Sequence, residues 1–392
     1  MKILMAHSHY RLPGGEETVF EREADLLRSR GHQVVEYRRY NSELSDLRLW
    51  DKLTFPKRLL WSSEAARDIR RLIRQERPDV VHFHNTHYMI SPSAYYACRE
   101  LGVPSVQSLD NPRLLCPAST FFRNDTVCQD CFKKVFAWPG VWHRCYRDSR
   151  IQTLGVAATT TFHRLVGTWT RVVDCYLAST EFYRQLFIEG GLPASRIKVK
   201  QHFVAPDPGA RNEAIGQYAL YVGRLAPEKG IHTLLAAWQR LDIPLKIRGS
   251  GQLLPFVQQA IKHTDSLELI ERLSVPELYA LMKGARFLVW PSEGLYETFG
   301  LVAVEAFACG IPVVGSNLGV MAEIVTDGVT GLHFNAGDPE SLAERVEWAW
   351  AHPDEMLTLG RSAREEYERK YTAERNGELL EEIYERLADS NS

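Results

Sequence analysis

The chain has 392 residues and a formal net charge of −2, with 45% hydrophobic and 24% charged residues. This composition is typical of a soluble globular protein, and the near-neutral charge gives no indication of a nucleic-acid partner. No apolar run approaches the roughly 18 residues of a membrane span, and the length favours two domains of roughly 150 to 200 residues each.

The first half of the chain carries short apolar runs that end in polar residues, which predict buried strands. The apolar start predicts the first strand and not a cleavable signal, so we expect a cytoplasmic protein. A helix-period segment over residues 16–30 follows it, and this alternation favours a parallel sheet. The predicted strands are residues 3–7, 80–84, 104–108 and 175–179.

The second half repeats the scheme, with predicted strands at residues 219–223, 245–249, 287–290 and 312–315. A linker rich in proline lies at 205–212, and the charged, helical segment 354–388 is expected to pack back on the first half. We therefore predict an α/β protein with two doubly wound, Rossmann-like sheets facing across a cleft. Its parts are a first domain over 1–205, a second over 206–370 and a helix over 371–392.

Two glutamates, Glu297 and Glu305, stand eight residues apart in the segment Pro291–Glu305. Helical spacing would separate them by roughly 12 Å, whereas paired carboxylates that act on one glycosidic bond lie about 5 to 9.5 Å apart. The pair is better suited to hold two ends of one long ligand, such as a nucleotide sugar. Between them, a positive helix start offers backbone donors to a diphosphate. We assign this donor contact to Thr298, Phe299, Gly300 and Leu301.

The second half resembles the retaining glycosyltransferases of family 4, which have the two-domain GT-B fold. The resemblance rests on residues 221–230, on 291–305 and on 308–316. It implies that Glu297 contacts hydroxyls of the donor sugar and that Glu305 contacts those of the ribose.

The resemblance also implies that Arg224 and Lys229 bind the diphosphate. Two fixed cations stabilise the departing diphosphate, so no catalytic metal is required. With Glu297 positioning the sugar, the departing phosphate can take the acceptor proton in a front-face reaction.

A glycine pair, Gly14 and Gly15, joins the first strand to the first helix. Glycine lets backbone amides approach a phosphate, although such a pair is also common in plain turns. The resemblance extends here and implies contact with the donor phosphate. No G-x-G-x-x-G occurs, which argues against a nicotinamide enzyme, and no phosphate-binding G-x-x-x-x-G-K-[ST] occurs either.

Polar residues that follow two strands of the first half are expected to line the acceptor side of the site, although histidines at strand ends are often structural. Many relatives have His-Asn or His-Asp where this chain has Asp110 and Asn111, and Asp110 is expected to orient the acceptor hydroxyl. The remaining acceptor-side residues are His82, His84 and Asn85.

Four of the seven cysteines fall within thirty residues, two of them as Cys-x2-Cys, the pair spacing of a tetrahedral zinc site. Disulfides are not expected in the cytoplasm, so structural zinc is favoured over reduced thiols or an iron–sulfur cluster. Similar insertions, here at about 112–150, occur in some bacterial relatives after a Leu-Leu-Cys-Pro. The predicted ligands are Cys116, Cys128, Cys131 and Cys145.

Residues 47–77 combine nine arginines and lysines with leucine, phenylalanine and tryptophan. Such a segment suits an anionic membrane surface, and the alternative is solvated helices with buried tryptophans.

Together these features predict a retaining glycosyltransferase that moves a hexose-type sugar from a nucleotide diphosphate sugar to a saccharide or lipid-linked acceptor. Cell-surface polysaccharide or glycolipid assembly is the expected context. Two alternatives are a GT-B nucleotide-sugar epimerase and a non-catalytic, nucleotide-sugar-binding subunit.

Overall fold

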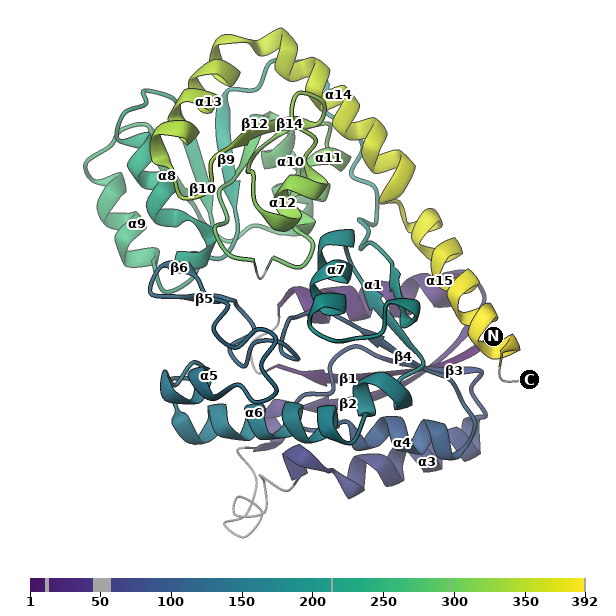
Figure 1. Cartoon of the computed structure of the whole chain (residues 1–392). Coiled ribbons are helices and arrows are strands. Elements are labelled where there is room, and N and C mark those ends of the chain that lie inside the picture. Colours follow the sequence, from purple (N-terminus) through teal and green to yellow (C-terminus); the bar gives the residue numbers. More distant parts are fainter. Residues whose placement is uncertain (11–13, 45–57, 213, 296, 391–392) are drawn as a thin grey trace. The chain divides into compact units, whose positions relative to one another are not determined.

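The computed structural model describes residues 1–10, 14–44, 58–212, 214–295 and 297–390 (Figure 1). Two compact units divide the chain. Unit 1 comprises Met1–Ser119, Gln129–Lys200 and Gly377–Ser392, and unit 2 comprises Thr120–Cys128 and Gln201–Asn376. Each unit is built around its own six-stranded parallel sheet. Among the described residues, no helix is both long and apolar enough to cross a membrane.

The sheet of unit 1 has the strand order β2-β1-β3-β4-β7-β8, and every neighbouring pair is parallel. This is the order of a flavodoxin-like sheet with one further strand. The central strands coincide with the four predicted runs, whereas the two outer strands were not predicted. The bounds are β1 (Lys2–His9), β2 (Gln33–Tyr40), β3 (Val80–Phe83), β4 (Ser105–Ser108), β7 (Cys175–Ala178) and β8 (Ile197–Val199).

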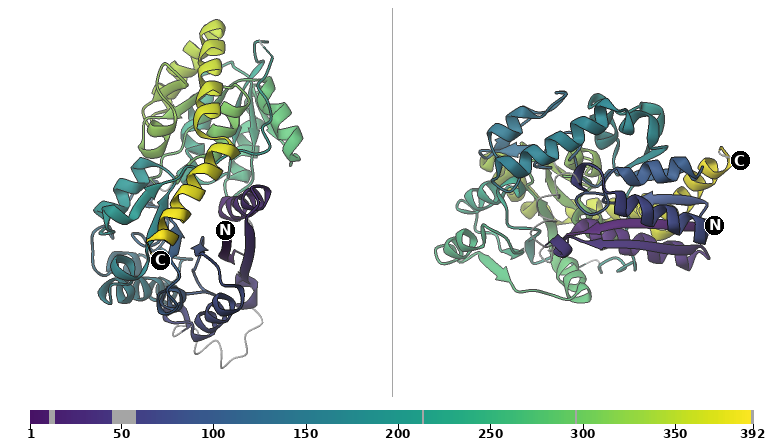
Figure 2. Two further views of the ribbon diagram at one scale, coloured as in Figure 1. Left: turned by 90° about the vertical axis from the view of Figure 1, so that its right-hand side faces the viewer. Right: turned by 90° about the horizontal axis from the view of Figure 1, so that it is seen from below.

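Helices flank this sheet and close its core. The bounds are α1 (Gly15–Ser29), η1 (Asn41–Leu44), α3 (Ser63–Glu76), α4 (Ser93–Glu100), α5 (Trp138–Trp142), α6 (Arg150–Leu165), η2 (Thr168–Val172), α7 (Glu181–Glu189), η3 (Ala194–Arg196) and α15 (Ala373–Asp389). From Gly377 onward α15, the last yellow helix in Figure 2, belongs to unit 1. Its Leu380, Ile383 and Tyr384 share one core cluster with Phe20 of α1.

The sheet of unit 2 has the order β11-β10-β9-β12-β13-β14, again all parallel. Numbered from β9, this is the 3-2-1-4-5-6 order of a dinucleotide-binding Rossmann sheet. The bounds are β9 (Tyr218–Val222), β10 (Leu245–Arg248), β11 (Leu267–Ile270), β12 (Ala285–Trp290), β13 (Val313–Ser316) and β14 (Gly331–Phe334). The prediction of an α/β protein with two doubly wound, Rossmann-like sheets is thereby confirmed.

A hairpin of β5 (Phe122–Arg123) and β6 (Thr126–Val127) also belongs to unit 2. The helices of this unit are η4 (Pro227–Lys229), α8 (Ile231–Trp238), α9 (Leu254–Ile261), α10 (Val275–Gly284), α11 (Leu301–Ala308), α12 (Gly319–Ile324), α13 (Pro339–Ala351) and α14 (Pro353–Lys370). The predicted linker at 205–212 is fixed to this unit, because Arg364 of α14 pairs with Asp207 at 2.6 Å and Lys283 donates to the carbonyl of Pro208 at 2.5 Å.

Doubly wound sheets bind ligands at the carboxyl ends of their strands, where the strand order reverses. In unit 1 this switch point lies between β1 and β3, and in unit 2 it lies between β9 and β12. The connections that leave these four strands carry nine of the nineteen residues that the sequence analysis selected.

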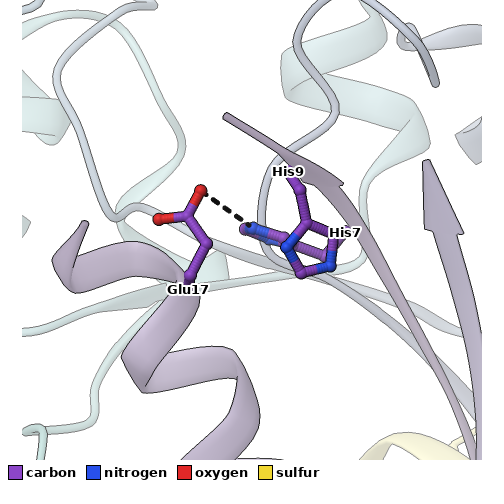
Figure 3. Close-up of side chains that lie close together, drawn as sticks. All are labelled: His7, His9 and Glu17. Atoms are coloured by element: carbon purple, nitrogen blue, oxygen red, sulfur yellow. Dashed lines mark ion pairs between the residues drawn. The ribbon is translucent and has the colours of Figure 1, made fainter. Parts of the chain in front are cut away.

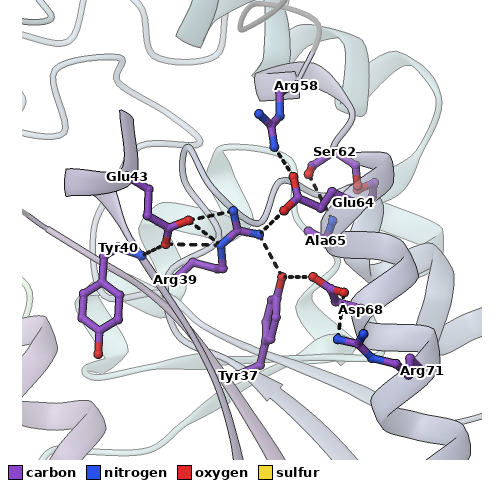
Figure 4. Close-up of polar contacts among 11 residues, drawn as sticks. Tyr37, Arg39, Tyr40, Glu43, Arg58, Ser62, Glu64, Ala65, Asp68 and Arg71 are labelled. Atoms are coloured by element: carbon purple, nitrogen blue, oxygen red, sulfur yellow. Dashed lines mark hydrogen bonds and ion pairs between the residues drawn. The ribbon is translucent and has the colours of Figure 1, made fainter. Parts of the chain in front are cut away.

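The basic segment 47–77 is described from residue 58 onward, and residues 45–57 lie outside the described residues. Several of its described cations are engaged by carboxylates (Figure 4): Arg58 pairs with Glu64, and Arg71 contacts Asp68 at 3.0 Å. Membrane contact by this segment stays a prediction.

Candidate active site

The centre of the candidate site in unit 2 is an ion pair between Lys229 and Glu297. Lys229 follows β9 through η4, and Glu297 lies in the loop that leaves β12. Their side chains are 18% and 12% exposed, and Lys229 Nζ lies 2.5 Å from Glu297 Oε2. Ser292 Oγ donates to the same carboxylate oxygen at 3.2 Å. Lys229, predicted to bind the diphosphate, and Glu297, predicted to bind the sugar, therefore also hold each other in place.

Arg224 stands on the first turn after β9, with a side chain that is 59% exposed. Its Nη2 contacts Glu228 Oε1 at 2.7 Å, and the hydroxyl of Tyr221 donates to its carbonyl oxygen at 2.9 Å. The backbone of Glu228 in turn accepts from the amide of Glu293 at 3.0 Å, which ties this loop to the loop after β12. A fixed backbone thus presents a solvent-accessible cation beside the Lys229–Glu297 pair.

A carboxylate that the sequence analysis did not assign, Glu293, lies at the same edge of the sheet. It accepts a hydrogen bond from Thr233 Oγ1 of α8 at 2.5 Å. Burial raises the pKa of Glu293, an effect that the Thr233 hydrogen bond opposes. The sequence could have indicated Glu293 as a site residue by its position directly after Ser292 in the Pro291–Glu305 segment.

Helix α11 begins beside these groups, with Gly300 as its N-cap in the left-handed region at φ +81°. A Cβ on Gly300 would lie 2.1 Å from two ring atoms of Trp290, so only glycine fits. The first amides of an α-helix have no acceptor within the helix, which leaves those of Leu301 and Val302 available to an anion. Glu305 follows one turn later and is half-buried.

The neighbouring Thr298 is half-buried, whereas the side chain of Phe299 is 1% exposed. The Phe299 ring contacts His202 edge-on, with ring centroids 5.0 Å apart. Phe299 therefore anchors the loop through its side chain, and a ligand can reach it only through its backbone.

In unit 1 the predicted glycine loop is held by Glu17 at the start of α1. Glu17 accepts from the amides of Tyr10 at 2.9 Å and of Gly14 at 2.8 Å. A Cβ at Gly15 would meet no atom within 4 Å, so the fold itself does not require glycine there. Residues 11–13 of this loop lie outside the described residues.

Glu17 also faces two buried histidines at the end of β1 (Figure 3). Its Oε1 lies 3.9 Å from His7 Nε2, and His9 packs edge-on against His7 with ring centroids 4.5 Å apart. Burial opposes ionisation of Glu17, but the nearby His7 and hydrogen bonds from backbone amides outweigh it and lower the pKa to about 2. Burial lowers the pKa of His7. A charged Glu17 beside a neutral His7 thus braces the loop.

His82 lies in the interior of unit 1, with both ring nitrogens engaged. Its Nε2 lies 2.8 Å from Ser108 Oγ, and its Nδ1 lies 2.7 Å from the hydroxyl of Tyr384 in α15. Behind it, the buried pair of Glu23 and Lys200 is in direct contact. Burial disfavours the charged form of Glu23, but Lys200 and the neighbouring histidines lower its pKa to about 2.

A cavity of about 80 Å³ opens in unit 1 beside these groups. Four of the five predicted acceptor-side residues line it, whereas His82 does not; the four are His84, Asn85, Asp110 and Asn111. His84 Nδ1 lies 3.7 Å from Asp110 Oδ2. The Asn85 side chain donates to the carbonyl of Ser8 at 2.8 Å, which fixes the end of β3 against β1.

Three half-buried polar side chains in or next to this cavity were not predicted. Arg113 lines it, and among the described residues its Nε and Nη1 have no hydrogen-bond partner. The same is true of Nε2 of His87, whose pKa is lowered by burial. Glu16 accepts from Asn111 Nδ2 at 3.0 Å, and burial, reinforced by Asp110, raises its pKa to about 7. These groups offer several donors and acceptors to a hydroxylated ligand.

The four insertion cysteines are all half-buried. The amide of Gly140 donates to Cys131 Sγ at 3.2 Å, a contact that suits a thiolate ligand. Cys116, Cys131 and Cys145 belong to unit 1, whereas Cys128 belongs to the hairpin of unit 2. Among the described residues, two histidine–glutamate groups bring three metal-binding side chains within 4.8 Å of one another, and the cysteines form no such group.

Two domains that are each built on a doubly wound parallel sheet form the GT-B fold, and in this chain both carry charged side chains at the switch point. Residues 14–201 match the family model of the glycosyl transferase 4-like domain, and residues 212–366 match that of glycosyl transferases group 1. The matched segments take up most of the chain, which belongs to the GT-B glycosyltransferases.

Among its relatives is an uncharacterised glycosyltransferase of Methanocaldococcus jannaschii, 32% identical over 180 residues that make up 45% of this chain and 50% of the relative. The D-rhamnosyltransferase WbpZ of Pseudomonas aeruginosa is 29% identical over 160 residues, or 40% of this chain and 42% of the relative. The chain thus spans half or less of these curated relatives. HepE of Anabaena, solved with UDP, superposes with a TM-score of 0.69 and 17% identity over 98% of this chain and 100% of its own, which shows the shared fold.

Proposed function

We propose that the protein transfers a hexose-type sugar from a nucleotide diphosphate sugar to an acceptor hydroxyl, with retention at the anomeric carbon. The observation that carries this proposal is the charged group at the switch point of unit 2. There Lys229, Glu297 and Arg224 stand beside the N-terminus of α11. This arrangement offers two cations and backbone amides to a diphosphate and a carboxylate to sugar hydroxyls.

In the proposed reaction, the bond between the anomeric carbon and the diphosphate oxygen breaks while Lys229, Arg224 and the α11 amides stabilise the developing charge. The acceptor oxygen forms its bond to the same face of that carbon, and its proton passes to the departing diphosphate. Glu297 positions the sugar through its hydroxyls. The products are the glycosylated acceptor and a nucleoside diphosphate, and no side-chain base is needed.

The proposed acceptor site is the cavity of unit 1. Asp110 is the proposed acceptor-orienting group, and Arg113 adds donors and His87 a ring nitrogen that have no hydrogen-bond partner among the described residues. Open space at Gly15 suits the close approach of a ligand phosphate to the backbone. We further propose that the acceptor is a saccharide or lipid-linked saccharide of cell-surface polysaccharide or glycolipid assembly, made on the cytoplasmic side of the membrane.

The test compares Glu297→Gln and Lys229→Ala with Lys246→Ala as a matched control. Lys246 lies on β10 of the same unit and pairs with Glu268 of β11 at 3.4 Å. Both site variants should lower turnover about 100-fold or more, and the control should retain it. Melting temperatures show whether each variant is folded. Normal activity of both folded site variants would disprove the assignment.

The donor can be identified by a thermal-shift screen of nucleoside diphosphates and their sugars. HepE was solved with UDP, so uridine compounds are tested first. A ligand at 100 times its dissociation constant adds about 2.7 kcal/mol to the free energy of unfolding. Release of nucleoside diphosphate only in the presence of acceptor distinguishes transfer from epimerisation, and any transfer excludes a non-catalytic binding subunit.

Structural zinc bound by Cys116, Cys128, Cys131 and Cys145 remains a separate proposal. The hydrogen bond that the Gly140 amide donates to Cys131 Sγ supports it. Elemental analysis should find one zinc per chain, and a metal-free, fully active preparation would contradict the proposal.

A further inference from the structure

Helices α5 and α6 of unit 1 carry an unusual outward-facing apolar surface. Among the described residues, sixteen large hydrophobic side chains are exposed, and half of them fall between residues 135 and 166. On α6, Ile151 is 81% exposed and Leu165 is 69% exposed. The eight residues are Val135, Trp138, Trp142, Ile151, Leu154, Phe162, Leu165 and Val166, which we call the α5–α6 surface.

The exposed residues of α6 follow helical spacing. Residues 151, 154, 158, 162 and 165 recur at intervals of three and four, which places them on one face of the helix. The opposite face is the buried one and includes Thr153, Val156 and His163. Since the inner face already packs on the core, the outer apolar stripe serves no purpose within unit 1.

Contacts between the two segments make the surface continuous. Helices α5 and α6 pack side by side (Figure 1). The hydroxyl of Thr161 donates to the carbonyl of Val135 at 2.9 Å, and Arg164 donates to the carbonyl of Lys134 at 2.6 Å. At the other end of α6, the guanidinium of Arg150 lies 5.5 Å from the ring centre of Trp142.

The surface is also strongly basic. Between residues 133 and 171 the chain has seven lysines and arginines and one acidic residue, Asp148. Lys134 Nζ lies 6.0 Å from the ring centre of Trp138, so each of the two exposed tryptophans of this surface has a cation beside it. Exposed tryptophans ringed by cations match the interface of an anionic bilayer, where indole rings lie at headgroup level and cations contact lipid phosphates.

We propose that the α5–α6 surface docks the protein on an anionic lipid bilayer. Charge complementarity selects this partner: Lys133 is paired with Glu189 at 3.0 Å, but the other six cations of the segment stand against one carboxylate and repel a second copy of the same surface. The contact lies in the plane of the bilayer: a helix of sixteen residues with one apolar outer face rests on the interface and does not span it. The proposal stands independently of the donor and acceptor of the proposed function.

The test is sedimentation of the full chain with vesicles of phosphatidylcholine, with and without phosphatidylglycerol. We expect binding only to the vesicles that contain phosphatidylglycerol, and weaker binding at high salt. Lys134→Gln with Arg150→Gln should lower partitioning about 25-fold, since each cation near the surface contributes about fivefold. Trp138→Ala with Trp142→Ala should lower it at least as much.

Trp348→Ala is the matched control, because Trp348 is 38% exposed in unit 2. It should bind like the unmodified protein, and all variants should keep their melting temperatures because the substituted side chains are exposed. Absence of vesicle binding, or equal binding by the surface variants, would overturn the proposal. A dimer that the same variants dissociate, without vesicle binding, would also overturn it and assign the surface to a second copy.

Discussion

Gly300 gives the sharpest test of how the proposed donor site is built. Substitution by alanine would force a side chain into the left-handed region, which costs about 1–2 kcal/mol, partly offset by about 0.4–1 kcal/mol from the stiffer unfolded chain. The new Cβ would also lie 2.1 Å from the ring of Trp290, where carbon atoms normally stay about 3.5–4.0 Å apart. Trp290 is 3% exposed, so its ring cannot move away freely. Overpacking adds about 1–3 kcal/mol, for a total loss of about 2–4 kcal/mol.

Gly328→Ala is the matched control, because Gly328 has φ +70° and its added Cβ would meet nothing within 4 Å. Its free energy of unfolding should fall only by the net cost of backbone strain, about 1 kcal/mol. Urea unfolding of both variants measures the difference, and nucleotide binding should weaken only in Gly300→Ala, whose α11 amides are displaced. Equal losses of stability would refute the steric argument.

Three further substitutions test the buried polar groups. Glu16→Gln should make stability less dependent on pH. Because the pKa of Glu16 is raised to about 7 in the native protein, stability falls by on the order of 3 kcal/mol as pH rises from about 4.5 through 7. Urea unfolding should therefore show the variant to be more stable than the unmodified protein at pH 8 and not at pH 4. Lys200→Met should cost about 3–5 kcal/mol by leaving Glu23 unpaired in the core, and adding Glu23→Gln should restore most of it; equal instability of the double variant would contradict this. Trp238→Phe removes a 2.8 Å hydrogen bond to the carbonyl of Ile243 and should cost about 2–4 kcal/mol, measured as a fall in melting temperature.

The sequence predicted the inner strands of both sheets and missed all four outer ones. A strand inside a parallel sheet is covered on both faces and forms a continuous apolar run, as in β1 and β12. The outer strands β2, β8, β11 and β14 are paired on one side only. Their sequences mix charged and apolar residues, as in Gln33–Tyr40, or are only three residues long, as in Ile197–Val199. The apolar sequence pattern that identifies a strand is therefore weaker in the outer strands, which are less buried than the inner ones.

The proposed site was predictable where chemistry is carried by a contiguous motif, as at Lys229 and Glu297. It was not predictable where distant segments meet. Arg113 and Glu16 belong to residue types that are usually exposed, and only packing reveals that both are half-buried near one another's charge. His82 is a further example of distant segments that meet, since its hydrogen-bond partner Tyr384 is 302 positions away in sequence.

Helix α15 has a consequence for the time course of synthesis. Leu380, Ile383 and Tyr384 complete the core of unit 1, but the ribosome makes them only after all of unit 2. At about 5–20 residues per second, the first strands wait roughly 10 to 35 s after Lys200 for that helix to be made. During that interval the face of the sheet that α15 will cover is exposed to water and to other chains. Unit 2, translated later, can complete its own fold first, so a chaperone that binds this nascent chain is expected to hold unit 1.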